Sequence, residues 1–238
     1  MLIAEIGVNH IGKKRNVNHF VNKLINSNID GITFQVIKPE ILAKLSLKEL
    51  SKEFYEKKIL QIKKSKKKIG IAINNISMVE FFDKQKIDFW KVLSIDFYNK
   101  KLIKKLVQTK KKIYISTGFS SSNDIIRMSQ IDKNINFIHT SLSSKIEDTN
   151  LSAIKSLKYK LGNKISFGLH SKDIDVIYAS IFYEPESIFF YVKNSKLKKI
   201  YDDKHAIELS NLNAKVKKIN YLKKAIGNSK KIKISFKK

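Results

Sequence analysis

The chain has 238 residues, of which 42% are apolar, and a formal net charge of +27. This size allows one large α/β domain with a full hydrophobic core, or two small domains. The absence of cysteine excludes disulfides, thiolate metal sites and a cysteine nucleophile. The first residues carry no basic leader, and no apolar run approaches the roughly 18 residues of a membrane span. We therefore expect a cytoplasmic protein with no membrane partner.

The positive charge comes from 46 lysines and only two arginines, Arg15 and Arg127. Base readout and bidentate phosphate contacts favour the planar fork of arginine. The lysines are spread along the chain in short runs that are typical of solvated helix faces and loops. We therefore expect no nucleic-acid partner, although a positive surface would attract small anionic substrates at low salt.

Short β-branched runs alternate with longer amphipathic stretches along the whole chain. The runs predict strands at 2–6, 31–36, 68–73, 88–93, 112–116, 135–140, 164–169 and 187–192. The amphipathic stretches predict helices near 16–27, 47–65, 76–85, 98–109, 121–129, 150–160, 173–182 and 205–226. Apolar strands separated by helices are typical of parallel sheets buried on both faces. Eight such units predict a single (β/α)8 barrel over residues 1–227, followed by a basic tail at 228–238.

A doubly wound open sheet is the competing fold. Such a sheet usually carries a G-x-G-x-x-G phosphate turn after its first strand. Here the first predicted strand is followed by GVNHIG (7–12), which weakens this alternative without eliminating it.

Polar residues concentrate at the carboxyl ends of the predicted strands, where the chemistry of a barrel collects. Lys91 interrupts the apolar fourth strand, and a lysine in a barrel core requires an anionic partner. The serine-rich run 116–124 could cap the following helix, and its backbone N–H groups could also bind a phosphate or carboxylate. With Ser94 nearby and Glu5 and Asp96 available for proton transfer, the pattern predicts a pocket for a small phosphorylated acid and a hydroxyl-rich partner.

These residues also have structural interpretations. Glu5 could be a paired carboxylate that only stabilises the core. His139 and His170, taken singly, could each be hydrogen-bonded core histidines, and two histidines do not define a metal site.

Several segments resemble the sialic acid synthase family, in the same order and spacing from residue 2 to about residue 160. They are IAEIGVNHIG (3–12), IDGITFQ (29–35), FWKVLSID (89–96), ISTGF (115–119), IHTS (138–141) and IEDTNLSAIKSL (146–157). The family's corresponding motifs include its opening segment, G-A-D-A-V-K-F-Q, F-K-I-A-S-G-D, S-T-G-M and H-C-T-S. Because the chain stops at residue 238, we expect a divergent member without the small C-terminal antifreeze-like domain of many members.

The resemblance implies an enzyme that condenses phosphoenolpyruvate with an N-acylated amino sugar to give a nonulosonic acid for surface carbohydrates. This would be a C–C bond-forming transferase of the N-acetylneuraminate synthase type, and we also consider a homodimer. Glu5, Lys91 and Asp96 are implied as catalytic residues. The implied substrate-binding residues are Asn9, His10, Gln35, Ser94, Ser116, Thr117, His139, Ser141 and His205.

The resemblance also implies a divalent metal, Mn²⁺ or Mg²⁺, but its two expected histidine ligands align with Lys172 and Tyr191. Only a change of register would make His170 a ligand, so no metal ligand is assigned. Thr33 stands where family members carry a lysine aimed at the phosphate. These departures leave two further hypotheses. One is a catalytically impaired barrel paralogue that binds a sugar or serves as a partner subunit, and the weaker one is a lysine-rich nucleic-acid binder.

Overall fold

A computed structural model describes residues 1–143, 145–162, 164–197, 201–227 and residue 230. The strands are β1 (Leu2–Gly7), β2 (Gly31–Val36), β3 (Lys68–Ile73), β4 (Phe89–Val92), β5 (Lys112–Ser116), β6 (Ile135–His139), β7 (Ile165–Gly168), β8 (Ile188–Lys193) and β9 (Ile207–Glu208). The α-helices are α1 (Lys14–Ile25), α2 (Pro39–Lys44), α3 (Lys52–Lys64), α4 (Val79–Lys84), α5 (Lys100–Val107), α6 (Ser122–Ser129), α7 (Ser152–Leu161), α8 (Asp175–Ser180) and α9 (Leu212–Ile226). Short 3-10 helices are η1 (Ile76–Met78), η2 (Ser94–Asp96), η3 (Glu147–Thr149), η4 (Ile181–Tyr183) and η5 (Asp203–His205).

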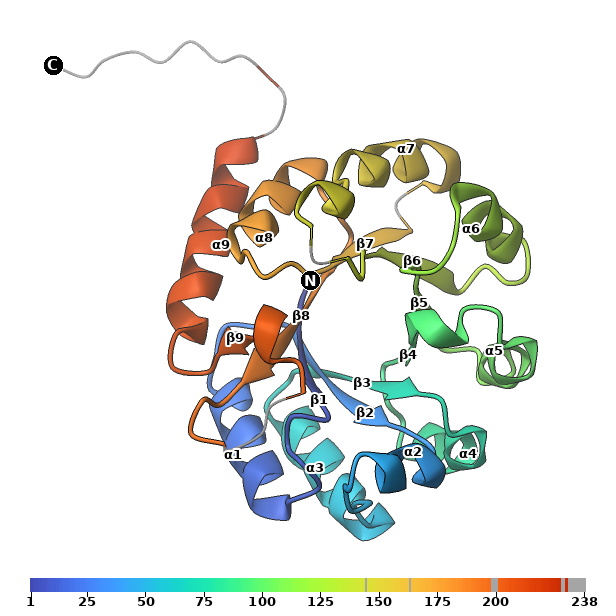
Figure 1. The fold of residues 1–238 in the computed structure, drawn as a ribbon, viewed down its shortest axis with the longest axis vertical. Helices are drawn as coiled ribbons and strands as arrows, with labels where there is room; N and C mark the ends of the chain where they lie inside the picture. The colour runs from blue at the N-terminus through green and yellow to red at the C-terminus, as the bar shows by residue number, and fades with distance from the viewer. Residues whose placement is uncertain (144, 163, 198–200, 228–229, 231–238) are drawn as a thin grey trace, which may run out of the picture.

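The strands form a closed parallel barrel. Each strand pairs in parallel with the next one in the chain, and β1 also pairs with β8. This last pairing closes the sheet, and Figure 1 shows the helices arranged in a ring around it. The predicted (β/α)8 barrel is therefore confirmed, and the open doubly wound sheet is excluded.

Two helices begin five or more residues later than predicted, and helix α2 and strand β9 were not predicted. The helix predicted at 47–65 begins only at Lys52, where the Ser51 hydroxyl accepts a hydrogen bond from the Phe54 N–H at 3.3 Å and caps it. The helix predicted at 205–226 begins only at Leu212, because the preceding residues form η5 and β9. Ile207 of β9 is buried against β8, and this tertiary pairing outweighs the local helical pattern. The predicted basic tail lies outside the described residues, apart from residue 230.

The barrel interior is built in layers, because every second residue of a strand points inward. The inner apolar layer is a cluster of Ile3, Phe89, Tyr114, Ile138 and Phe189. Two residues further along their strands, toward the carboxyl ends, come Glu5, Lys91, Ser116 and Tyr191. The apolar layer therefore forms the floor of a polar layer at the C-terminal mouth of the barrel.

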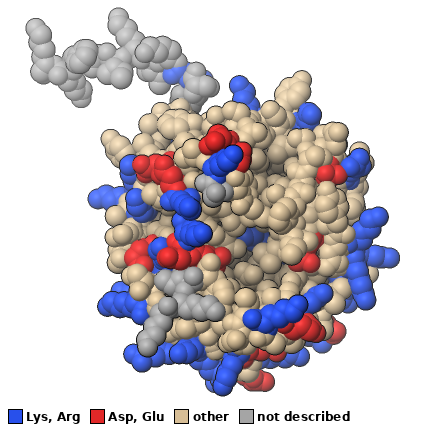
Figure 2. Space-filling model, in the orientation of Figure 1, with Lys and Arg blue, Asp and Glu red and all other residues tan. Residues whose placement is uncertain are grey.

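Lysines and arginines are distributed around the rim of the face in Figure 2, with acidic groups among them and a hollow near the centre. On this face they do not gather into one continuous stripe. Within the described part of the chain, no helix is long and apolar enough to cross a bilayer.

Candidate functional site

A buried ion pair lies at the centre of the barrel mouth. Lys91 Nζ is 2.5 Å from Glu5 Oε2, and the two side chains are 3% and 4% exposed. The Thr33 hydroxyl donates to the same carboxylate oxygen at 3.4 Å. Lys91 thus has the anionic partner that its place in an apolar strand requires. An ammonium has three donors, and the described hydrogen bonds of Lys91 use one of them.

Tyr191 forms the wall beside this pair. It is the β8 partner of Glu5 in the strand register, and its ring centroid lies 5.4 Å from Lys91 Nζ. Burial raises the pKa of the Tyr191 phenol well above its ordinary value, and the charges of Glu5 and Asp202 raise it further. The phenol therefore stays protonated, while the negative face of its ring stabilises the ammonium.

Ser94 and the turn after β5 meet on another side of the mouth. The Ser94 hydroxyl accepts a hydrogen bond from the Gly118 N–H at 3.1 Å, and a Cβ at Gly118 would lie only 2.9 Å from that hydroxyl. The Thr117 hydroxyl donates to the carbonyl of Ile138 at 3.1 Å. The predicted residues Ser94, Ser116 and Thr117 are all buried, and the Ser94–Gly118 bond joins Ser94 to the turn that follows Ser116 and Thr117.

His10 and Gln35 line one small cavity of about 10 Å³. His10 Nδ1 accepts a hydrogen bond from the Gly12 N–H at 3.0 Å, and burial lowers the His10 pKa to about 4, so the ring is neutral. Leu50 and Tyr55 line the same cavity. It has room for about one water molecule, so a sugar could reach these two residues only if their neighbours moved.

His139 and Ser141 make hydrogen bonds within their own connection. His139 Nε2 donates to the carbonyl of Thr149 at 2.9 Å, which fixes the Nε2–H tautomer. The Ser141 hydroxyl accepts from the Ser143 N–H at 3.2 Å. These bonds order the loop that follows β6 beside the turn after β5.

Asp96 makes no hydrogen bond or ion pair with the other two predicted catalytic residues in the described structure. Its Oδ1 accepts from the Asn99 carboxamide at 3.2 Å, and its Oδ2 is buried with no hydrogen-bond partner among the described residues. Neither Glu5 nor Lys91 is among its hydrogen-bond or ion-pair partners in the described ranges. The structure therefore joins Glu5 to Lys91 but does not join Asp96 to either.

A second group of titratable side chains packs beside Tyr191. The ring centroids of His170 and His205 lie 4.6 Å apart with 31° between the ring planes, and Tyr191 meets both rings edge-on. Asp202 Oδ1 lies 3.8 Å from His205 Nε2. Asp202 is a site residue that the sequence analysis missed. The sequence feature that could have identified it is the acidic pair Asp202–Asp203 shortly before His205. The predicted helix began at residue 205, so these two residues were treated as its approach.

Burial shifts the protonation of this group. It lowers the pKa of His170 to about 3, with smaller contributions from His205 and Lys91, and it lowers the pKa of His205 to about 4, helped by Lys91. Burial also raises the pKa of Asp202 to about 7, and the negative charge of Glu5 adds to the effect. Two neutral imidazoles and a carboxyl that titrates near neutrality thus share one corner of the mouth.

The described residues do not fit a divalent metal centre. Among them, no group of three or more His, Cys, Asp or Glu side chains could hold an ion. Lys172 is exposed and Tyr191 is packed against rings, so neither position supplies an imidazole. His170 and His205 meet ring to ring, whereas metal ligands aim their in-plane nitrogen lone pairs at a common point. We therefore derive no step through a metal.

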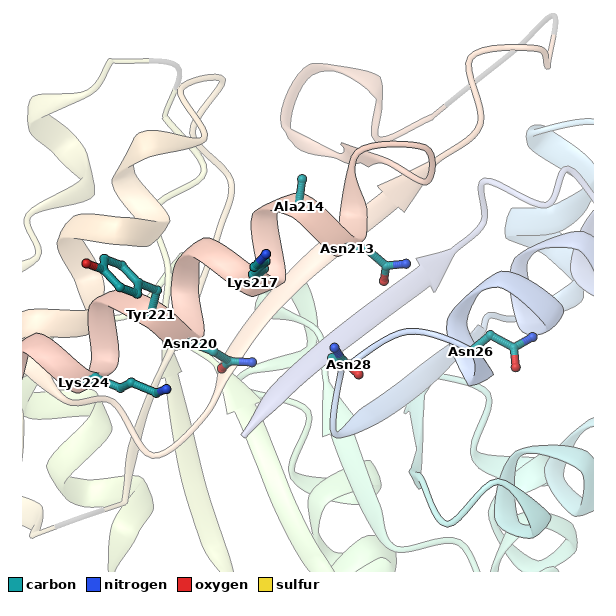
Figure 3. A pocket seen from close by; sticks show the side chains of 8 residues that line it. All are labelled: Asn26, Asn28, Asn213, Ala214, Lys217, Asn220, Tyr221 and Lys224. Carbon is teal, nitrogen blue, oxygen red and sulfur yellow. The ribbon is translucent and has the colours of Figure 1, made fainter.

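A groove of about 530 Å³ lies outside the barrel, between α9 and the end of α1. Figure 3 shows the side chains that line it, which include Asn26, Asn28, Asn213, Lys217, Asn220, Tyr221 and Lys224. All of these polar side chains are exposed, and none belongs to a buried charged group. The buried charges that can do chemistry lie at the mouth, so we place the candidate site there.

The closed barrel and its polar strand ends define a (β/α)8 protein with a buried ion pair at the C-terminal face. The sequence matches the NeuB family over residues 23–231. The chain belongs to the NeuB family.

Two relatives and one solved structure show the extent of the similarity. The chain is 29% identical to an uncharacterized protein of Methanocaldococcus jannaschii over 188 residues, which are 73% of this chain and 56% of the relative. It is 24% identical over 212 residues to N,N'-diacetyllegionaminic acid synthase of Campylobacter jejuni, covering 76% of this chain and 64% of that protein. The chain thus spans less than two thirds of the length of either relative. A crystal structure of N-acetylneuraminic acid synthetase from Leptospira borgpetersenii in complex with citrate superposes with a TM-score of 0.90 at 20% identity, over 98% of this chain and 87% of that one.

Proposed function

We propose that this protein condenses phosphoenolpyruvate with an N-acylated amino sugar to give a nonulosonic acid, in the biosynthesis of surface carbohydrates. Membership of the NeuB family and similarity to a relative named as a legionaminic acid synthase support this class of reaction. The observation that carries the proposal is the buried Glu5–Lys91 pair at the mouth, with the Ser94–Gly118 turn on another side of it. A fixed cation and a polar turn suit a small acid that carries a phosphate.

The phosphoenolpyruvate would bind between Lys91 and the turn after β5. Lys91 would neutralise a carboxylate or phosphate oxygen, while Ser94, Ser116 and Thr117 would supply hydroxyl and backbone donors around it. Because these groups are already held by the strands and by each other, they would need little reorganisation when the anion arrives.

The reaction joins C3 of phosphoenolpyruvate to the aldehyde carbon of the open-chain sugar. The aldehyde oxygen takes up a proton, water adds at C2, and the C2–O bond to phosphate breaks so that inorganic phosphate leaves. Glu5 and Asp96 are the predicted proton-transfer groups, and Glu5 is the one that contacts Lys91. NeuB enzymes are generally metal-dependent, but the donor set here assigns no residue to that role.

The sugar side stays a prediction and comprises Asn9, His10, Gln35, His139, Ser141 and His205. Among these residues, Asn9 is fully buried and its carboxamide already makes three hydrogen bonds within the protein. Two of these residues, His10 and Gln35, share a cavity, and His205 lies beside Asp202. The hydroxyl-rich substrate would reach this side over the Glu5–Lys91 pair. A homodimer likewise stays a prediction.

The test is turnover by the purified full chain. We expect phosphate release from phosphoenolpyruvate, and a product of the condensed mass, with N-acetylmannosamine or a diacetamido sugar as acceptor. Lys91→Met should abolish the release, whereas Asn136→Leu, a buried substitution in β6 outside the proposed site, should retain it. Phosphate at background with every acceptor, both with and without Mn²⁺ or Mg²⁺, would reject the proposal.

The second candidate is a barrel paralogue that has lost catalysis and binds a sugar or a partner subunit. It is favoured because the described residues include no three-ligand metal group, and because Asp96 makes no hydrogen bond with Glu5 or Lys91 among them. Calorimetric binding of an N-acylated amino sugar without phosphate release would support it.

A further inference from the structure

Asn9 is completely buried, and three hydrogen bonds engage its carboxamide. Its Nδ2 donates to the carbonyl of Val192, the penultimate residue of β8, at 2.9 Å. Its Oδ1 accepts from the N–H of Tyr201 at 3.1 Å and from the N–H of Asp202 at 3.0 Å. Both lone-pair directions of the oxygen are therefore used inside the protein.

These bonds join three parts of the chain that are far apart in the sequence. Asn9 follows β1, Val192 belongs to β8, and Tyr201 and Asp202 lie in the connection to β9. One side chain thus ties this connection to the two strands that close the barrel. Asp202 and His205 lie in the described part of this connection, and His205 packs against Tyr191 at the mouth.

The absence of a side chain at Gly7 leaves space for the Asp202 carboxyl. Gly7 has a φ of +57°, and a Cβ there would lie 2.8 Å from Asp202 Oδ2 and 2.8 Å from the Tyr191 ring. That Asp202 oxygen is buried and has no hydrogen-bond partner among the described residues. An unpartnered buried carboxyl oxygen costs free energy, so it persists only where the surrounding structure holds it.

We propose that Asn9 is a positioning residue that holds the backbone of Tyr201 and Asp202 at the barrel mouth, and thereby places the Asp202 carboxyl to exchange protons beside the Glu5–Lys91 pair. The role of Asp202 in turnover rests on the proposed function, whereas the hold on the backbone does not. Four groups from other strands or from η5 act on Asp202 or contact it: Glu5, Lys91, Tyr191 and His205. Its elevated pKa agrees with a carboxyl that can both take up and release a proton near neutrality.

Hydrogen exchange of the 201–205 segment tests the hold directly. Asn9→Leu has similar size and removes all three bonds, so we expect exchange of the Tyr201 and Asp202 amides to quicken at least about tenfold. Asn9→Asp keeps the two acceptor contacts and should preserve most of the protection, which also covers the case in which Asn9→Leu does not fold. Asn136→Leu is the matched control, because Asn136 is a buried asparagine whose carboxamide bonds only locally, to the Asn134 carbonyl. Unchanged exchange in Asn9→Leu, or equally fast exchange in Asn9→Asp, would overturn the proposal.

Turnover tests the second half of the proposal. In the parent protein, Asp202→Asn should remove one limb of the pH profile of kcat while the KM for phosphoenolpyruvate changes less. Asn9→Leu should remove the same limb. The double variant Asn9→Leu with Asp202→Asn should have a kcat less than about twofold below that of Asp202→Asn alone, because both changes act through Asp202. A full additional loss in the double variant would overturn the link to Asp202. If the parent releases no phosphate at all, the proposed function fails, and the exchange result still decides whether Asn9 holds the segment.

Discussion

The two sides of the barrel mouth are held together by different kinds of contact. On the side of β4 and β5, Ser94 and Thr117 bond to backbone groups, and the one acidic group nearby, Asp96 of η2, bonds to Asn99 through Oδ1 while its Oδ2 is buried without a partner among the described residues. On the side of β8 and β9, Tyr191, Asp202 and His205 pack as titratable side chains, and Asp202 keeps an unpartnered oxygen in the described structure. We expect the first side to receive an anion with little change in its own contacts. The second side is built to change its protonation, and the Glu5–Lys91 pair lies between them.

The largest expected effect comes from breaking that pair. Lys91→Met leaves the Glu5 carboxylate buried without its cation, so we expect the free energy of unfolding to fall by about 3–5 kcal/mol. Urea denaturation measures the change. The double variant Glu5→Gln with Lys91→Met should recover much of the loss, because no unpaired charge then remains buried. If the double variant were as unstable as the sum of the two single variants, the pair would not be the source of the effect.

Gly7→Ala is the next largest change, and it acts only on the β8–β9 side. The positive φ costs an alanine about 1–2 kcal/mol, and the added Cβ would also press on Asp202 and Tyr191. We expect the free energy of unfolding to fall by about 2–3 kcal/mol in urea denaturation. The matched control is Gly7→Ala in an Asp202→Ala background, which keeps the backbone strain at residue 7 but removes the carboxyl that the added Cβ would press on. Equal losses in both backgrounds would mean that Asp202 does not set the cost.

The difference between the two sides also explains what the sequence could predict. Strands and inward-facing positions follow local period-two patterns, so the barrel and the burial of Glu5, Lys91 and Ser116 are visible in the sequence. The residues of the β4–β5 side, Ser94 and 116–118, directly follow their strands in the sequence, so a local pattern contains them. The β8–β9 side depends on contacts across the chain, such as that of Asn9 with Tyr201, which no local pattern contains. For the same reason Asp202 was missed, and the segment before α9 was predicted as helix.

A pH series separates the titratable groups of the β8–β9 side. Between about pH 4 and 7 the folded protein binds a proton at Asp202 that the unfolded chain has released. This contribution to stability is complete below about pH 4 and is lost as the pH rises through 7. The pKa of His205 is lowered to about 4, so its contribution has the opposite sign: it is complete above about pH 6.5 and is lost as the pH falls through 4.

Asp202→Asn and His205→Gln should therefore tilt the pH dependence in opposite directions. Relative to the parent protein, Asp202→Asn should gain stability as the pH rises from 5 to 7, by up to about 1.4 kcal/mol per pH unit. Relative to the parent protein, His205→Gln should lose stability as the pH rises from 4 to 6.5, because the variant lacks the gain that His205 gives the parent over this range. Urea denaturation across this range measures both trends. Curves for both variants that run parallel to that of the parent would show that neither group changes its pKa on folding.

The smallest expected effect tests the β4–β5 side. Ser94→Ala removes the acceptor of one hydrogen bond from the Gly118 N–H, so we expect stability to fall by about 1 kcal/mol, with no change in its pH dependence. Because the turn then loses its fixed contact, the KM for phosphoenolpyruvate should rise several-fold while kcat changes less. Ser27→Ala is the matched control, since Ser27 is buried and bonds to the Leu24 carbonyl, away from the mouth. It should show a similar loss of stability without the change in KM. An altered pH dependence in Ser94→Ala would contradict the separation of the two sides, because it would mean that the uncharged turn also controls the protonation of the β8–β9 side.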